Sequence, residues 1–221
     1  MIKISNLTKV FKTQGEEITA LNSVDLHIKN AEFVAIMGRS GSGKSTLLNI
    51  LGCMDKATSG KYFLSNQDIS TLDDDALSKI RNEHIGFVFQ GFHLLPRLSA
   101  FENVLLPLRY STEKITEKGK QRAKELLIQV GLEDRMYHMP NQMSGGQIQR
   151  VAIARSLINE PDILLADEPT GNLDSTISNQ IMDLLTDLNQ SGQTIVMVTH
   201  EDDIAECANR TIHFLDGEIL P

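Results

Sequence analysis

A glycine-rich segment at residues 38–45 carries the clearest chemical pattern in the sequence. It fits the spacing G-x-x-x-x-G-K-[ST]. Glycines let backbone N–H groups approach an anion without a Cβ in the way, and a lysine ammonium adds a full positive charge. The hydroxyl of Ser45 is of the type that binds Mg²⁺ beside a nucleotide. The segment predicts a site for the phosphates of a nucleoside triphosphate, and the candidate binding residues are Gly38, Arg39, Ser40, Gly41, Ser42, Gly43, Lys44, Ser45 and Thr46.

Two acidic residues, Asp167 and Glu168, follow the apolar run at 163–166. In an open parallel sheet, ligands bind beyond the carboxyl ends of the strands. We therefore expect Asp167 to hold Mg²⁺, directly or through water, and Glu168 to accept a proton from an attacking water. Taken alone, such a pair is more often two acids in an exposed loop after a core strand, and the phosphate loop upstream favours the catalytic interpretation.

A second glycine motif precedes a strongly helical segment. Ser144 is a suitable N-cap, and a glycine pair after it leaves backbone N–H groups bare at a helix N-terminus, which favours an anion. One nucleotide seldom needs two such loops from one chain. We therefore expect two copies to be arranged head to tail, so that each phosphate loop faces the partner's motif, Ser144, Gly145, Gly146 and Gln147.

The elements that must position these residues follow from the apolar pattern. Short apolar strands alternate with helical segments, which predicts an α/β fold with a mostly parallel sheet and helices on its faces. Buried strands are expected at 33–37, 163–166 and 194–198, with a helix over 45–51 after the phosphate loop. Residues 2–8, 18–28 and 61–64 predict an antiparallel patch, and Asp216-Gly217 between apolar runs predicts a hairpin. We expect a single domain over 1–221, with a sheet core at 1–94 and 160–221 and a helical subdomain inserted at about 95–159.

The composition excludes several classes of protein. With 21 Lys and Arg against 29 Asp and Glu, the net charge is −8, which disfavours a dedicated nucleic-acid binder because phosphate affinity comes largely from basic clusters. The longest apolar runs have strand length, so we expect neither a membrane span nor a signal peptide. Cys53 and Cys207 are too few for a disulfide framework. We expect both to be small buried side chains in a cytoplasmic, reducing compartment.

The order and spacing of these motifs resemble the nucleotide-binding subunit of an ABC (ATP-binding cassette) transporter over essentially the whole chain. The matching segments are the Walker A loop at 38–45, the glutamine loop at 87–90, the signature at 144–147, Walker B at 163–168, the D-loop at 171–175 and the switch histidine, His200. The resemblance implies a P-loop NTPase with a RecA-like mixed sheet core, an N-terminal antiparallel β subdomain and an inserted helical subdomain. It also implies an ATPase that uses ATP and Mg²⁺.

The resemblance assigns roles to further residues. It implies that Phe11, where the family more often has Tyr, stacks on adenine. Gln90 would contact Mg²⁺ or the attacking water, and His200 would hold the γ-phosphate and the water while Glu168 acts as the base. Asp174 would cross the dimer interface and couple the two sites. The implied Mg²⁺ ligands are Ser45, Gln90 and Asp167.

Residues 51–55, 86–90, 94–96, 102–108 and 169–174 resemble the MacB/LolD group within this family. That implies an FtsX-like permease as partner, export, lipoprotein release or mechanotransmission as the function, and a peripheral position on the cytoplasmic face of the inner membrane. The alternatives are a cell-division ATPase of the FtsE type and a soluble ABC protein of DNA repair or translation. The soluble types are disfavoured because the Walker A loop and the signature lie too close in sequence to enclose a long coiled coil, and because the chain has one cassette.

Overall fold

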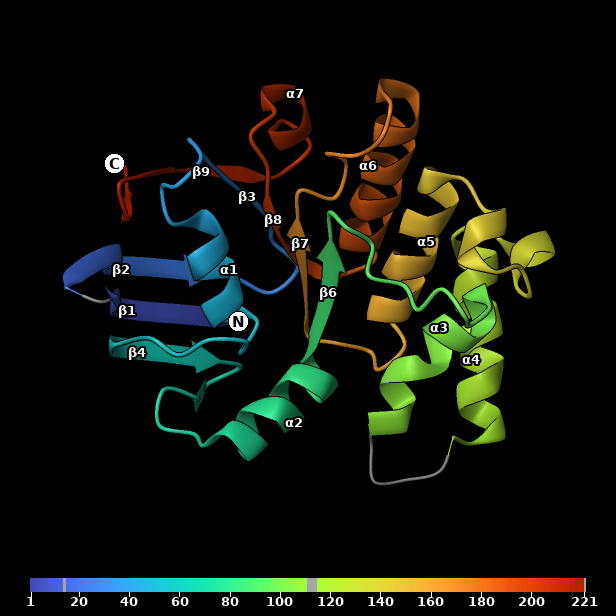
Figure 1. Ribbon diagram of the computed structural model, residues 1–221, viewed down its shortest axis with the longest axis horizontal. Helices are drawn as coiled ribbons and strands as arrows, with labels where there is room; N and C mark the ends of the chain where they lie inside the picture. Colours follow the sequence, from blue (N-terminus) through green and yellow to red (C-terminus); the bar gives the residue numbers. More distant parts are fainter. Residues whose placement is uncertain (14, 111–114, 221) are drawn as a thin grey trace. The chain divides into compact units, whose positions relative to one another are not determined.

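The computed structural model describes residues 1–13, 15–110 and 115–220. The chain divides into two compact units (Figure 1). The first unit joins Met1–Arg81 to Asn189–Pro221, and the second is Asn82–Leu188. The predicted division into a core and a subdomain at 95–159 stays a prediction.

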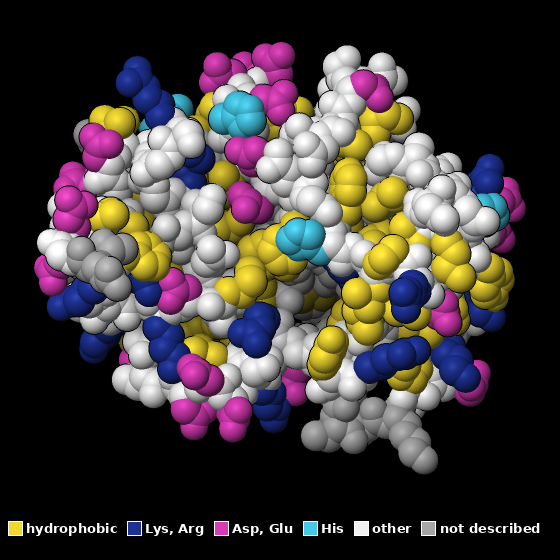
Figure 2. All heavy atoms as spheres, viewed as in Figure 1, with side chains coloured by type: hydrophobic (Ala, Val, Ile, Leu, Met, Phe, Trp, Pro, Cys, Tyr) yellow, Lys and Arg dark blue, Asp and Glu magenta, His cyan; other side chains and the backbone are white. Residues whose placement is uncertain are grey.

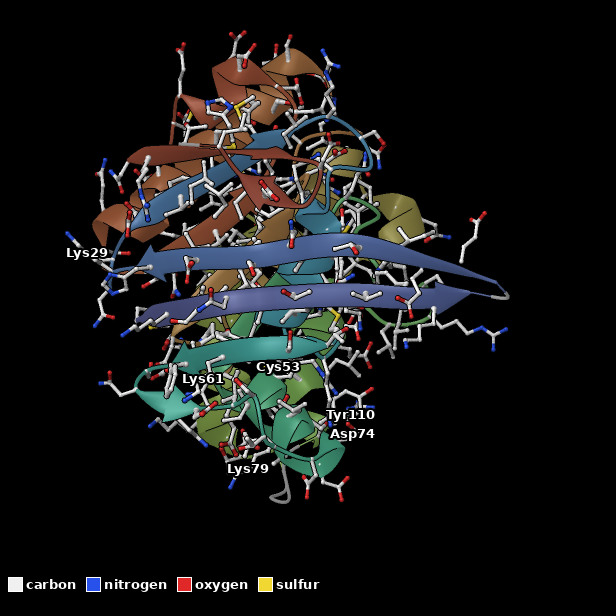
Figure 3. All side chains as sticks on the ribbon, turned by 90° about the vertical axis from the view of Figure 1, so that its left-hand side faces the viewer. Lys29, Cys53, Lys61, Asp74, Lys79 and Tyr110 are labelled. Atoms are coloured by element: carbon white, nitrogen blue, oxygen red, sulfur yellow. The ribbon has the colours of Figure 1, made fainter. Side chains whose placement is uncertain are left out.

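The first unit begins with an antiparallel sheet in the order β2 (Glu16–Ile28), β1 (Ile2–Thr13), β4 (Ser59–Leu64) and β5 (Gln67–Asp68). Figure 3 faces this sheet, with β2, β1 and β4 side by side and Lys61 labelled on β4. Alternate residues such as Ile2 and Ile4 are buried, as expected for a sheet with one face on a core. The predicted antiparallel patch is confirmed.

A second sheet in the first unit carries the strand that leads into the phosphate loop. β3 (Phe33–Gly38) lies between two parallel neighbours, β8 (Thr194–Val198) and β9 (Arg210–Leu215). β8 is buried along its whole length, as is typical of parallel strands covered on both faces. β10 (Glu218–Ile219) pairs antiparallel with β9 through Asp216-Gly217, so the predicted hairpin is confirmed. The helices α1 (Lys44–Leu51) and α7 (Asp202–Ala205) belong to this unit, and α2 (Asp74–His84) begins in it.

The second unit pairs β6 (Ile85–Phe89) with β7 (Ile163–Asp167) in parallel. Helix α5 (Gly145–Ser156) packs against β6 and against α3 (Ala100–Leu105) and α4 (Glu117–Gln129). Buried residues such as Val104, Leu127 and Ile153 fill the space between these helices. The unit also contains the 3₁₀ turns η1 (Leu106–Tyr110), η2 (Glu133–Arg135) and η3 (Pro140–Gln142), and nearly all of α6 (Ser175–Gln190).

The two cysteines differ in exposure. Cys53 is buried as predicted, whereas Cys207 is exposed, so the prediction was wrong for Cys207. The reason is that α7 ends at Ala205. Cys207 follows in a turn, and the helical spacing that buries Ile204 does not extend to it. Within the described ranges, the helices are all too short or too polar to cross a membrane.

Candidate functional site

The phosphate loop runs from the end of β3 to the start of α1. Gly38 (φ +153°) and Gly43 (φ +105°) have no room for a Cβ, because one would collide with the carbonyl oxygens of Phe214 and Ala20, respectively. The Lys44 ammonium donates to the carbonyl oxygens of Gly38 and Arg39 at 2.7 and 2.9 Å. The side chain is buried. The positive charge of Lys44 therefore lies within the phosphate loop, bonded to the loop's own backbone.

The loop fits a triphosphate by its polar groups. Gly43 is the N-cap of α1, so no side chain can cover the first N–H groups of the helix, and these groups favour an anion. The Ser42 hydroxyl is buried and has no hydrogen-bond partner among the residues that the structure describes. Buried polar groups normally have a partner, and a phosphate oxygen would supply one.

His200 leaves the sheet at the edge where the phosphate loop begins. Ile36 of β3 pairs with Val198 of β8, and the two strands are parallel. The Thr199 backbone N–H donates to the carbonyl oxygen of Ile36 at 3.2 Å, which extends the pairing by one residue. The His200 side chain follows at the carboxyl end of β8 and is exposed. The first unit thus brings the loop and the histidine to one sheet edge.

Phe11 lies on β1 with 40% of its surface exposed. The Lys9 ammonium lies 4.8 Å from the centre of its ring and pairs with Asp55 at 2.6 Å. An exposed aromatic face is what stacking on a nucleobase requires.

In the second unit, Gln90 and Glu168 follow the ends of two paired strands. Phe89 of β6 pairs with Asp167 of β7. Gln90 and Glu168, the next residues, therefore both lie at the carboxyl ends of these two strands. Glu168 has φ +45°, which is uncommon for a residue with a side chain. A Cβ placed on Gly171 would lie 2.7 Å from Gln90 Nε2 and 3.4 Å from Glu168 Oε2. Gln90, a predicted Mg²⁺ ligand, and Glu168, the predicted catalytic base, therefore approach the same glycine.

Ser144 caps helix α5 as the sequence predicts. Its hydroxyl accepts from the Gln147 N–H at 3.3 Å, and the Gln147 side chain accepts from the Ser144 N–H at 3.0 Å. Gly145 is exposed, whereas Gly146 is buried and packs directly against Ile177 of α6.

Asp174 caps the neighbouring helix, α6. Its carboxylate accepts from the Ile177 N–H at 3.1 Å. Because Ile177 contacts Gly146 and Leu173 lies beside Gly145, the signature and the D-loop form one surface.

Three polar residues to which the sequence analysis assigned no role bond to the backbone of this unit. Gln149 is fully buried and donates to the Pro169 carbonyl oxygen at 2.6 Å, just after Glu168. Asn103, also fully buried, accepts from the Leu95 N–H at 2.8 Å and donates to backbone carbonyls at 95, 98 and 99. Arg155 donates to the carbonyl oxygens of residues 92 and 93. Only the polar type of Gln149 and Arg155 within an apolar helical pattern could have drawn attention to them.

Comparison with known proteins agrees with this arrangement. The family model described as ABC transporter matches residues 21–171. An uncharacterized ABC transporter ATP-binding protein of Bacillus subtilis, YknY, is 54% identical over 222 residues, covering 100% of this chain and 96% of that protein. The macrolide export ATP-binding/permease protein MacB of Vibrio parahaemolyticus is 49% identical over 220 residues, covering 100% of this chain but 34% of that protein.

A solved structure gives the same fold. It is the dimeric post-hydrolysis state of the ATP-binding cassette MJ0796 bound to ADP and Pi, with a TM-score of 0.91, 50% identity, and coverage of 100% of this chain and 97% of that one. The curated protein MJ0796, from Methanocaldococcus jannaschii, is 53% identical over 223 residues and covers 99% of this chain and 95% of that protein. The predicted fold class and the use of ATP with Mg²⁺ are confirmed. The chain belongs to the ABC transporter family, in which it is an ATP-binding cassette subunit that hydrolyses ATP.

Proposed function

We propose that two copies of this cassette close head to tail around two ATP–Mg²⁺ and drive an FtsX-like permease for export, lipoprotein release or mechanotransmission. The observation that carries the proposal is that one chain has two helix N-termini suited to an anion, α1 behind the phosphate loop and α5 behind Ser144. MJ0796 was solved as a dimer, and MacB joins an ATP-binding part to a permease. Both similarities support the proposal.

The proposal gives each predicted residue a role. The phosphate loop, residues 38–46, binds the phosphates, and Phe11 stacks on the base. Ser45, Gln90 and Asp167 hold Mg²⁺, which neutralises charge on the phosphates when bound. Glu168 takes a proton from the attacking water, and His200 holds the water and the γ-phosphate. The partner's nucleotide is contacted by Ser144, Gly145, Gly146 and Gln147, with Asp174 at the dimer interface.

The permease partner is supported by an apolar surface on the second unit. Leu95, Tyr137 and Met139 are exposed, and the Tyr137 and Phe101 rings lie 6.0 Å apart. Figure 2 shows hydrophobic side chains gathered over the helices of this unit. Exposed apolar patches mark interaction sites. A permease that docks here would hold the cassette at the cytoplasmic face of the inner membrane, and no nucleic acid takes part.

Glu168→Gln and Lys44→Ala test the nucleotide chemistry. Glu168→Gln removes the base and a negative charge, so we expect an ATP-bound dimer in size-exclusion chromatography and turnover reduced by roughly 10²–10⁴-fold. Lys44→Ala removes the charge in the loop and is expected to lose ATP binding and to stay monomeric. Full turnover by Glu168→Gln, or an ATP-dependent dimer of Lys44→Ala, would contradict the assignment.

A separate variant tests the proposed contact with the permease. Leu95→Asp places a charge on the apolar surface of the second unit. When it is co-expressed with an FtsX-like permease that co-purifies with the parent chain, we expect ATPase activity of the isolated subunit to be retained and co-purification with the permease to be lost. Undiminished co-purification would show that this surface is not the docking site.

A further inference from the structure

The chain makes a strained turn directly after Gln90. Phe92 and His93 have φ of +59° and +49°, and the left-handed conformation is unfavourable for a residue with a Cβ. Hydrogen bonds within the segment itself give the turn little support. The Phe92 N–H donates to the Phe89 carbonyl oxygen at 3.1 Å, and the His93 N–H donates to that of Gly91. Two consecutive strained residues persist only where the surroundings hold them. Residues 90–93 are called the glutamine turn below.

Arg155 of α5 is the group that holds this turn. Its guanidinium donates to the carbonyl oxygen of His93 at 2.6 Å and to that of Phe92 at 2.9 Å. Burial lowers the pKa of Arg155, but a guanidinium stays charged, so both are charge-assisted bonds of the stronger kind. The fork of the guanidinium matches two successive carbonyls, which is a geometry that Lys cannot reproduce.

Two further contacts complete the support of the turn. The Asn172 side-chain amide of the D-loop donates to the Gln90 carbonyl oxygen at 2.9 Å. The His93 ring packs on Phe89, with centroids 4.8 Å apart. Gln90 is therefore tied at its own carbonyl to the D-loop and, through the turn, to the helix that Ser144 caps.

We infer that Arg155 is a positioning residue for Gln90, which it acts on through the carbonyls of Phe92 and His93. The inference rests on the proposed role of Gln90 at Mg²⁺ or the attacking water. Arg155 itself makes no contact with a reacting atom in this scheme. Because a misplacement of about 1 Å can cost roughly 10²-fold in rate, releasing the turn lowers turnover without touching the phosphate loop.

The chain offers a closely matched control. Arg122 of α4 also donates to two successive carbonyls, those of Leu157 and Ile158, each at 3.1 Å. These carbonyls follow the C-terminal end of α5, in contrast to those of the glutamine turn. Arg122→Ala thus removes the same kind of bonds, together with an ion pair to Glu160 at 3.2 Å, and leaves the turn untouched.

The experiment compares Arg155→Ala, Arg155→Lys and Arg122→Ala in the full chain. For each variant, kcat, the Mg²⁺ concentration at half-maximal rate, ATP affinity and Tm are measured. For Arg155→Ala we expect kcat to fall by roughly tenfold or more and the Mg²⁺ midpoint to rise, with ATP affinity within about twofold of the parent. Arg155→Lys should recover part of both losses. Arg122→Ala should lower Tm with kcat and the Mg²⁺ midpoint unchanged.

If Arg155→Ala and Arg122→Ala both lower Tm and leave kcat and the Mg²⁺ midpoint unchanged, the inference is overturned. If Arg155→Ala does not fold, Arg155→Lys decides, since it keeps the charge and loses the fork: an unchanged Mg²⁺ midpoint then overturns the inference.

A double variant separates the inference from the proposed function. If Arg155 acts through Gln90, adding Arg155→Ala to Gln90→Ala lowers kcat by less than about twofold more. If the two substitutions instead reduce kcat by independent factors that multiply, Arg155 does not act through Gln90, and the role of Gln90 itself is unaffected. If Gln90→Ala alone changes neither kcat nor the Mg²⁺ midpoint, the role of Gln90 falls, and the inference falls with it.

Discussion

Phe89 and Asp167 are paired neighbours on the parallel strands β6 and β7. Because adjacent strands lie about 4.8 Å apart, Gln90 and Glu168 start from neighbouring positions as the chain leaves the sheet. Both side chains then approach Gly171, which has no side chain to occupy the space between them. The parallel register thus accounts for the meeting of two residues that are distant in sequence.

Gly171→Ala is expected to reduce activity with little loss of stability. The new Cβ would lie 2.7 Å from Gln90 Nε2, and this amide is at the end of a flexible side chain that can move away with little loss of stability. Moving it displaces the group proposed to contact Mg²⁺ or water, so kcat should fall by roughly tenfold. Steady-state ATPase assays and thermal unfolding check this, and a normal kcat would show that the Gln90 amide need not occupy this position.

The two signature glycines should differ in their tolerance of alanine. A Cβ on Gly146 would collide with Ile177, a β-branched side chain with little freedom, whereas one on Gly145 would meet the ends of Leu173 at 3.3 Å and Phe92 at 4.0 Å. We expect Gly146→Ala to lower the free energy of unfolding by about 1–3 kcal/mol and Gly145→Ala to change it by less than about 0.5 kcal/mol. Urea denaturation compares them, and equal losses would refute the packing role of Gly146.

Glu102 should stabilise the fold only above acidic pH. Its carboxylate accepts from the Ser99 N–H and hydroxyl, both at 2.8 Å, and these bonds lower its pKa, the backbone bond most. A lowered folded-state pKa means that the stabilisation is present above the ordinary pKa of Glu and is lost as the pH falls through the folded value.

Glu102→Gln tests this dependence. We expect the variant to be less stable than the parent at pH 7 by about 0.3–1 kcal/mol, because a neutral amide can still accept from the Ser99 N–H but the negative charge near the helix N-terminus is lost. The difference should shrink as the pH falls below the ordinary pKa of Glu and through the lower folded-state value. Urea midpoints at a series of pH values measure it, and a difference that is constant with pH would exclude the carboxylate as its source.

The two thiols should react at very different rates. Burial raises the pKa of Cys53 to about 11, with Arg81 opposing the shift, and only the thiolate is a good nucleophile. Cys207 is exposed. A thiol reagent at pH 8 should therefore label one cysteine quickly in the native protein and both after denaturation. Cys207→Ser should abolish the fast phase, and a fast phase that survives it would show that Cys53 is accessible.

Much of the molecule could be predicted from local spacing. Residues 33–37 and 194–198 form buried strands as expected, and Asp216-Gly217 turns a hairpin. Ser144 caps its helix through Gln147. Each of these depends on the side chains and backbone freedom of a few consecutive residues, so the pattern is visible in the chain itself. The motif order was enough to identify the family.

The tertiary structure alone decided which distant segments support the predicted site residues. Gln149 binds the turn after Glu168, and Arg155 binds the turn after Gln90. Both use backbone carbonyl acceptors. Every residue has a carbonyl oxygen, so the accepting residue carries no recognisable pattern in the sequence. Only the packing of α5 in the folded unit brings donor and acceptor together. For the same reason, the exposure of Cys207 and the close contact of Gly146 with Ile177 became known only when the elements were placed in space.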